Sequence, residues 1–145
     1  MLPRTRLDKV VQIRERTEDA ALCTLARAQV TLVDARERLT EAREATRADG
    51  RAAGPVELWH LDELSHRRAL QLFRAAEGVV TKATSGEADA RQGWTGAHRE
   101  TEVVRRVQSR RVTEILDERE RRERRDADEM ATLRFNAARF NAPRS

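Results

Sequence analysis

Apolar residues recur along the first third of the chain with the spacing of a coiled coil. One alanine and one leucine series each repeat every seven residues, and the two are offset by four: Ala21, Ala28, Ala35 and Ala42, with Leu25, Leu32 and Leu39. This alternation of three- and four-residue steps is the seam of a coiled coil, and small alanines let two backbones approach closely. Upstream, Leu7 and Val11 fit the seam, but Arg14 and Glu18 also fall on it. The pattern predicts a long helix over residues 5–48.

The segment after residue 55 is also predicted to be helical, and it carries two apolar stripes. The first stripe consists of Leu58, Leu61, Ser65, Ala69, Leu72, Ala76 and Val79. The second stripe consists of Trp59, His66, Leu70, Phe73 and Val80. A two-stranded seam buries only one stripe of a helix. The surplus therefore indicates either a local third helix or a docking surface for another protein.

Glycine and proline divide the chain between these elements. All six glycines lie between residues 50 and 96, whereas residues 5–48 and 97–141 contain neither glycine nor proline. Gly50 suits the end of the first helix and Pro55 the first turn of the next, so we expect a turn over residues 49–55. Three further glycines predict a kink or a mobile joint near residues 86–96. Helix is then expected to continue to residue 141.

Together these elements predict an all-α fold, a single coiled-coil domain over residues 1–145. We expect a long antiparallel two-helix hairpin with a helix over 5–48, a turn over 49–55 and a longer helix over 56–141. Two helix registers are open. Sequential helices joined by a short turn usually pair, and this favours facing residues whose numbers add up to about 104. Leu32 then faces Leu72, Ala35 faces Ala69, and roughly 40 C-terminal residues overhang.

In the other register the two ends of the chain pair with each other. Facing residue numbers then add up to about 140, so that Leu25 faces Ile115 while residues 49–96 form an insert. Arg14 and Glu18 would face Asp126 and Arg122 in this arrangement. This register matches polar seam positions to charged residues, but it requires the central third of the chain to be accommodated elsewhere.

Ten consecutive charged residues, Asp117 to Asp126, lie within the second predicted helix. Residues of opposite charge stand four apart in six pairs here: Asp117–Arg121, Glu118–Arg122, Glu120–Arg124, Arg122–Asp126, Arg124–Asp128 and Arg125–Glu129. Each such pair stabilises an isolated helix by roughly 0.2–0.5 kcal/mol. The segment is therefore expected to remain helical without packing against a partner.

Composition favours a long helical assembly and argues against a large globular core. The chain is 37% charged and 3% aromatic and has no tyrosine, so it has few residues with which to build such a core. The net charge of +4 is spread evenly; residues 97–145, for example, hold 13 basic and 10 acidic residues. A nucleic-acid-binding protein more often shows an unbalanced basic face. Nucleic acid is therefore not an expected partner.

The sequence contains no recognisable catalytic or metal-binding set. It lacks a glycine-rich phosphate loop and a nucleophile elbow, and His60 with Glu63 makes a poor metal site. We therefore expect neither enzymatic activity nor a cofactor. Cys23 is the single cysteine and is expected to pack as a small side chain. No stretch has the apolar length of a signal peptide or a membrane helix, so a cytoplasmic protein without membrane insertion is expected.

The layout and one local motif resemble the FliJ/YscO family, small coiled-coil proteins of flagellar and injectisome type III export. The best local match is "ERRERRDADEMA", where an acidic residue, a basic pair, Asp-Glu and a small residue follow in order: Glu123, Arg124, Arg125, Asp128, Glu129 and Ala131. The resemblance covers nearly the whole chain. The absence of tyrosine and a central helix rich in arginine and alanine depart from the family pattern. These departures leave the choice between flagellar and injectisome systems open.

The resemblance implies a stalk-like protein. The family's coiled coil is similar to the central stalk of rotary ATPases, enters the export ATPase hexamer and contacts the cytoplasmic domain of the export gate. Some members also handle empty export chaperones. Carried over by position, the ATPase-facing residues are Leu7, Val11, Arg14, Arg121, Arg122, Glu123, Arg124, Arg125, Asp128, Glu129 and Met130. The gate-facing residues are Trp59, His66, Leu70 and Phe73.

A different class of function also fits the heptads. A generic coiled-coil scaffold or dimerisation protein has the same repeat and no export partners. Such a protein would form a stable parallel dimer, whereas a protein similar to the FliJ/YscO family is a monomeric hairpin.

Overall fold

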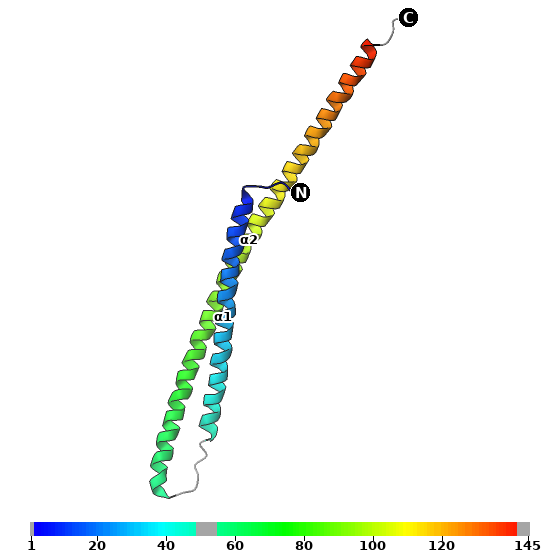
Figure 1. Ribbon diagram of the computed structural model, residues 1–145. Coiled ribbons are helices and arrows are strands. Elements are labelled where there is room, and N and C mark those ends of the chain that lie inside the picture. Colours follow the sequence, from blue (N-terminus) through cyan, green and yellow to red (C-terminus); the bar gives the residue numbers. More distant parts are fainter. Residues whose placement is uncertain (1, 49–54, 142–145) are drawn as a thin grey trace. The chain divides into compact units, whose positions relative to one another are not determined.

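The computed structural model describes residues 2–48 and 55–141. It contains two helices, α1 (Leu7–Ala48) and the longer α2 (Val56–Phe140), as Figure 1 shows. The described residues form no strand. The two helices pack against each other, which confirms the predicted all-α pair with a longer second helix.

Both helices begin with side chains or residues suited to a first turn. Thr5 donates from its backbone N to Asp8 Oδ2 at 3.1 Å and from Oγ1 to Asp8 Oδ1 at 2.7 Å. Thr5 is the donor in both bonds; the one from its backbone N–H corresponds to one half of a capping box and satisfies a backbone donor at the start of α1. Pro55 precedes α2, and its carbonyl accepts a hydrogen bond from Leu58 N at 3.0 Å. The predicted cap at Gly50 lies outside the described residues.

The helices contribute to two compact units. The larger, called the hairpin unit below, is Glu15–Arg99; the terminal unit combines Met1–Arg14 with Glu100–Ser145. In the hairpin unit the segments of α1 and α2 run antiparallel, side by side (Figure 1). Leu25, Leu32 and Ala35 are buried there, at 7%, 8% and 3% exposure. The alanine/leucine seam predicted for α1 is thus confirmed as its packing face.

The inward face of α2 combines members of both predicted stripes. Its half-buried positions advance in steps of three and four: Ala69, Phe73, Ala76, Val80, Ala83, Glu87, Ala90, Trp94 and Ala97. The exposed residues include Leu58, Leu61, Leu72 and Val79 from the first stripe. The expectation that the seam would bury only one of the two stripes was therefore wrong, because the seam runs between them.

Both registers considered from the sequence are wrong in detail. In the hairpin unit Glu18 contacts His98 and Arg43 lies over Phe73. In the terminal unit Asp8 contacts Gln108, and Arg14 contacts both Glu100 and Thr101. The residue numbers of these partners add up to between 114 and 116. The preferred register, near 104, had the correct pairing of sequential helices but was offset by about three helical turns.

Side-chain size explains the offset. The observed register places the three seam leucines of α1 opposite alanines, with Leu25, Leu32 and Leu39 facing Ala90, Ala83 and Ala76. It places the intervening alanines opposite larger residues, with Ala21, Ala28, Ala35 and Ala42 facing Trp94, Glu87, Val80 and Phe73. Every layer then holds one small and one large side chain, which suits a constant helix separation. The register near 104 would pair Leu32 with Leu72 but Ala28 with Ala76 and Ala35 with Ala69, so large and small layers would follow one another.

α2 is unbroken through the glycine-containing stretch. Gly86, Gly93 and Gly96 all have helical backbone, and none has a positive φ. The neighbouring seam residues Ala90 and Trp94 are half-buried there. Packing therefore outweighs the roughly 1 kcal/mol that each glycine costs a helix relative to alanine. A kink or mobile joint at this position stays a prediction.

Candidate functional site

The C-terminal part of α2 presents all its side chains to solvent. Every residue from Leu116 to Asn141 is exposed, and this segment, the bare helix below, includes the predicted residues from Arg121 to Met130. One of the predicted charge pairs is formed, with Arg124 Nη2 2.6 Å from Glu120 Oε1. The bare helix thus offers both signs of charge on every face.

Its last turns add apolar side chains to this surface. Met130, Leu133, Phe135 and Phe140 are all exposed, the last at 92%. Met130 was predicted as a site residue, whereas Leu133, Phe135 and Phe140 were not. Their spacing of two to five residues in a polar sequence gave only a weak signal.

The predicted site residues of α1 lie elsewhere in the terminal unit. Val11 is buried, Leu7 is half-buried, and Arg14 forms an ion pair with Glu100. On α2, Glu100 pairs with Arg14, and Gln108 contacts Asp8, the neighbour of Leu7. Arg121 is 13 residues beyond Gln108, which corresponds to about 20 Å along a helix. The structure therefore separates the predicted ATPase-facing residues into a packed group and a bare group.

Besides the Arg14–Glu100 ion pair, two hydrogen bonds join α1 and α2 in the packed group. Thr101 is fully buried, and its hydroxyl donates to the carbonyl of Arg14 at 3.3 Å. Gln108 Nε2 donates to Asp8 Oδ1 at 2.6 Å. The hydrogen bonds from Thr5 and then Gln108 lower the pKa of Asp8, because they stabilise its charged form. Sequence reasoning missed these contacts because the polar seam positions were paired in another register.

The predicted gate-facing residues differ in exposure. Trp59 is 59% exposed, whereas His66, Leu70 and Phe73 are half-buried. The guanidinium carbon of Arg43 lies 5.9 Å from the centroid of the Phe73 ring, within the range of a cation–π contact. Trp59 is therefore largely exposed to solvent, while Phe73 packs within the hairpin unit.

Large apolar residues surround Trp59 on the first turns of α2. Val56, Leu58, Leu61 and Leu64 are each about half to two thirds exposed. Leu58 and Leu61 belong to the first predicted stripe, whereas the predicted gate-facing residues were all taken from the second. We call these four residues with Trp59 the tip patch.

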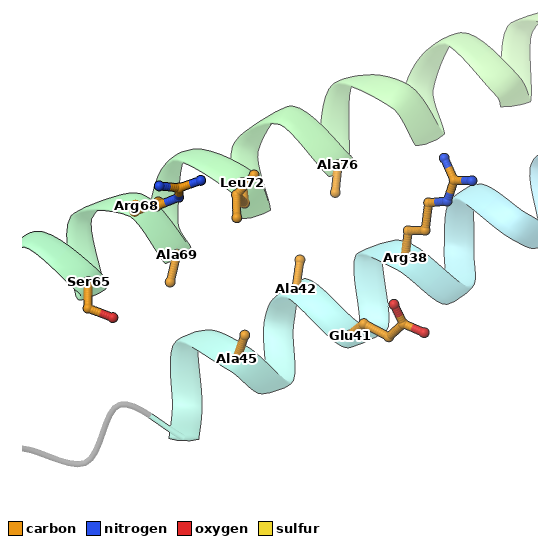
Figure 2. Close-up of a pocket in the computed structure, with 9 residues that line it drawn as sticks. All are labelled: Arg38, Glu41, Ala42, Ala45, Ser65, Arg68, Ala69, Leu72 and Ala76. Atoms are coloured by element: carbon orange, nitrogen blue, oxygen red, sulfur yellow. The ribbon is translucent and has the colours of Figure 1, made fainter.

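A groove runs between the two helices beside the tip patch in the hairpin unit. It has a volume of about 500 Å³ and is lined by Arg38, Glu41, Ala42 and Ala45 of α1 and Ser65, Arg68, Ala69, Leu72 and Ala76 of α2. Figure 2 shows the alanine side chains of the two helices directed toward each other across it. Because alanines reach only a short way, they leave apolar space between the helices. Charged residues border this space.

The described residues were also compared with two other kinds of site, a metal centre and a membrane-spanning segment. No group of three or more His, Cys, Asp or Glu side chains in residues 2–48 and 55–141 is placed to hold a metal ion. Neither described helix has a stretch long and apolar enough to cross a membrane. The rings of Trp94 and His98, one turn apart on α2, stack with their centroids 5.4 Å apart.

The family model described as "Flagellar FliJ protein" matches residues 3–140. The chain belongs to the FliJ family. Its membership makes the protein a structural component of flagellar type III export. The match also confirms the resemblance that the motif around Asp128 suggested. Searches of the curated proteins and of the solved structures found no match.

Proposed function

We propose that this FliJ-family protein is a stalk that binds the export ATPase ring and couples it to the export gate on the cytoplasmic side. The observation that carries the proposal is the bare helix, which is helical from Leu116 to Phe140 with every residue exposed. A single α-helix with its side chains is about 10–12 Å wide, a suitable width for the axis of a protein ring. Its mixed charges permit contact without a permanent apolar grip.

The bare helix is the proposed ATPase contact, with Arg121, Arg122, Arg124 and Arg125 as its main cationic groups. All four side chains belong to exposed residues. Arginine forms bidentate contacts with carboxylates, so these residues suit acidic groups on a ring. Val11 and Leu7 act indirectly in this proposal, because they pack α1 against α2.

The tip patch and the adjoining groove are the proposed contact with the cytoplasmic domain of the export gate. Exposed Leu61 and Trp59 supply apolar area, and Arg68 borders the groove with a positive charge. Interfaces often centre on such aromatic and aliphatic anchors. Handling of empty export chaperones is part of the proposal through the family resemblance alone, and no residue is assigned to it.

The ATPase contact is tested by mixing the protein with its cognate export ATPase and measuring hexamer formation and ATP turnover. Replacing Arg121, Arg122, Arg124 and Arg125 with Glu should weaken binding at least tenfold, because the four cations become anions. The matched control replaces four exposed arginines of α1 with Glu: Arg16, Arg27, Arg36 and Arg47. Circular dichroism checks that both variants remain helical.

The outcome separates the stalk from a generic scaffold. Loss of binding in the bare-helix variant alone supports the proposed contact. Equal binding by both variants would move the contact to another part of the chain. A wild-type protein that sediments as a stable dimer and leaves the ATPase unchanged would favour a scaffold.

A further inference from the structure

The seam of the hairpin unit repeats every seven residues on both helices. On α2 the small positions are five alanines, Ala69, Ala76, Ala83, Ala90 and Ala97, all half-buried. On α1 the leucines Leu25, Leu32 and Leu39 repeat with the same period. Because the periods are equal, sliding α1 along α2 by seven residues leaves each of these leucines opposite an alanine.

A slide by half a repeat does not have this property. It would bring leucines of α1 to the large residues of α2, such as Phe73 and Val80, and alanines to alanines. Such layers alternate overpacking with empty space, both of which are unfavourable. The seam therefore permits registers that are whole heptads apart and excludes those between.

One heptad-shifted register is favoured by the connection between the helices. In the observed register, the end of α1 at Ala48 is level with about residue 67, so the first turns of α2 extend beyond it. A seven-residue slide toward the connection would bring Leu32 opposite Ala76 and Leu25 opposite Ala83. It would also bring α1 alongside part of the exposed tip patch. Apolar packing alone thus does little to oppose this slide.

Specific polar contacts do oppose it, and they occur in each unit. In the hairpin unit, His98 Nδ1 lies 2.7 Å from Glu18 Oε1. In the terminal unit, Arg14 pairs with Glu100, and the hydroxyl of buried Thr101 donates to the Arg14 carbonyl. A seven-residue slide moves each partner about 10 Å, which breaks all these contacts. Polar residues at seam positions commonly specify the register of coiled coils.

We propose that these contacts form a register lock and that the hairpin has a second register one heptad away. The lock consists of the pairs Glu18–His98 and Arg14–Glu100 together with Thr101. The Arg14 and Glu100 side chains are 44% and 59% exposed, so a charged partner can reach and compete for them. When the lock is released, α1 moves seven residues along α2 toward the connection. It then covers seven more residues of α2 at that end and seven fewer at the other.

Disulfide cross-linking distinguishes the two registers in the full chain. In a Cys23→Ser background, Leu32→Cys with Ala83→Cys reports the observed register, and Leu32→Cys with Ala76→Cys reports the shifted one. The lock variant combines Arg14→Ala, Glu18→Ala and Thr101→Val. The matched control combines Arg16→Ala, Asp19→Ala and Thr24→Val, which change the same kinds of side chain at exposed positions.

In the protein with an unchanged lock and in the control, the rate of cross-linking between positions 32 and 83 should be at least tenfold higher than the rate between positions 32 and 76. The lock variant should raise the 32–76 rate at least tenfold. Cross-linking of the lock variant through 32–83 alone would overturn the proposal, because the register would then be held without the lock. Rapid 32–76 cross-linking in the wild type would overturn it as well.

A charge exchange keeps the test decisive if the lock variant loses helix content. Arg14→Glu alone should favour the 32–76 cross-link, since it places two carboxylates together. Adding Glu100→Arg should restore the 32–83 cross-link by re-forming the pair with opposite polarity. Failure of the second change to restore it would overturn the proposal.

Discussion

The seam of the hairpin unit and the bare helix are both α-helical, but different forces hold them. Around Leu32 and Ala35, the helix is held by apolar packing against a neighbour. From Leu116 to Asn141, every side chain is exposed, so the helix there depends on helix-forming residues and on charge pairs such as Glu120–Arg124. The comparison shows that one continuous helix can depend on packing at one place and on local electrostatics at another.

The largest expected effect comes from removing a seam leucine. Leu32→Ala should destabilise the hairpin by about 2–4 kcal/mol, because it leaves an alanine–alanine layer with a cavity. Urea unfolding followed by circular dichroism measures this loss. Val33→Ala, one position away and exposed, is the control and should cost less than about 0.5 kcal/mol. Equal effects would mean that the seam contributes no more than the surface.

Salt should separate the two regions next most clearly. Raising the salt concentration to about 1 M shortens the Debye length to roughly 3 Å and weakens exposed charge pairs. Amide hydrogen exchange in residues 117–129 should then quicken several-fold, while exchange in residues 25–42 should change little. A uniform response would show that charge pairs do not hold the bare helix.

Gly93→Ala should stabilise the region in which α2 packs against α1, without changing the bare helix. A Cβ added at Gly93 meets nothing within 4 Å, and the backbone there is already helical. The change should stabilise the protein by about 0.5–1 kcal/mol, because alanine favours helix over glycine. Thermal unfolding measures it. A decrease in stability would indicate that a bend at this glycine is needed.

The smallest expected effect is acid sensitivity at Asp8. Its pKa is lowered in the folded protein, so its contribution is present above the unfolded value of about 3.9 and is lost as pH falls through the folded pKa. Asp8→Asn should therefore flatten the stability profile below about pH 4. Unfolding midpoints between pH 2 and 6 test this, with exposed Asp19→Asn as the control.

The first seam was readable from sequence because its alternation of alanine and leucine is regular. The second was obscured because Glu87, Thr101 and Gln108 occupy positions where apolar residues are expected. Register depends on matching side-chain sizes between both seams, so one seam could not determine it. The heptad spacing from Ala69 to Ala97 was nonetheless present in the sequence.

The candidate site, too, could be predicted only in part. Exposure of the charged run followed directly from its composition, since ten consecutive charged residues cannot be buried. The half-burial of Leu70 and Phe73 did not, because it depends on the line along which α1 meets α2. Two adjacent apolar stripes leave that line undecided until both packing faces are known.

The pairing of large with small side chains across the seam also constrains how the sequence can diverge. A change of Leu32 to alanine should be tolerated best when Ala83 is replaced by a larger residue. A larger residue at Ala35 should likewise be tolerated best when Val80 is replaced by a smaller one. Substitutions along the seam should therefore accumulate as compensating exchanges across each layer. In an aligned set of FliJ-family sequences, such exchanges would appear as covarying positions whose residue numbers in this chain add up to about 115.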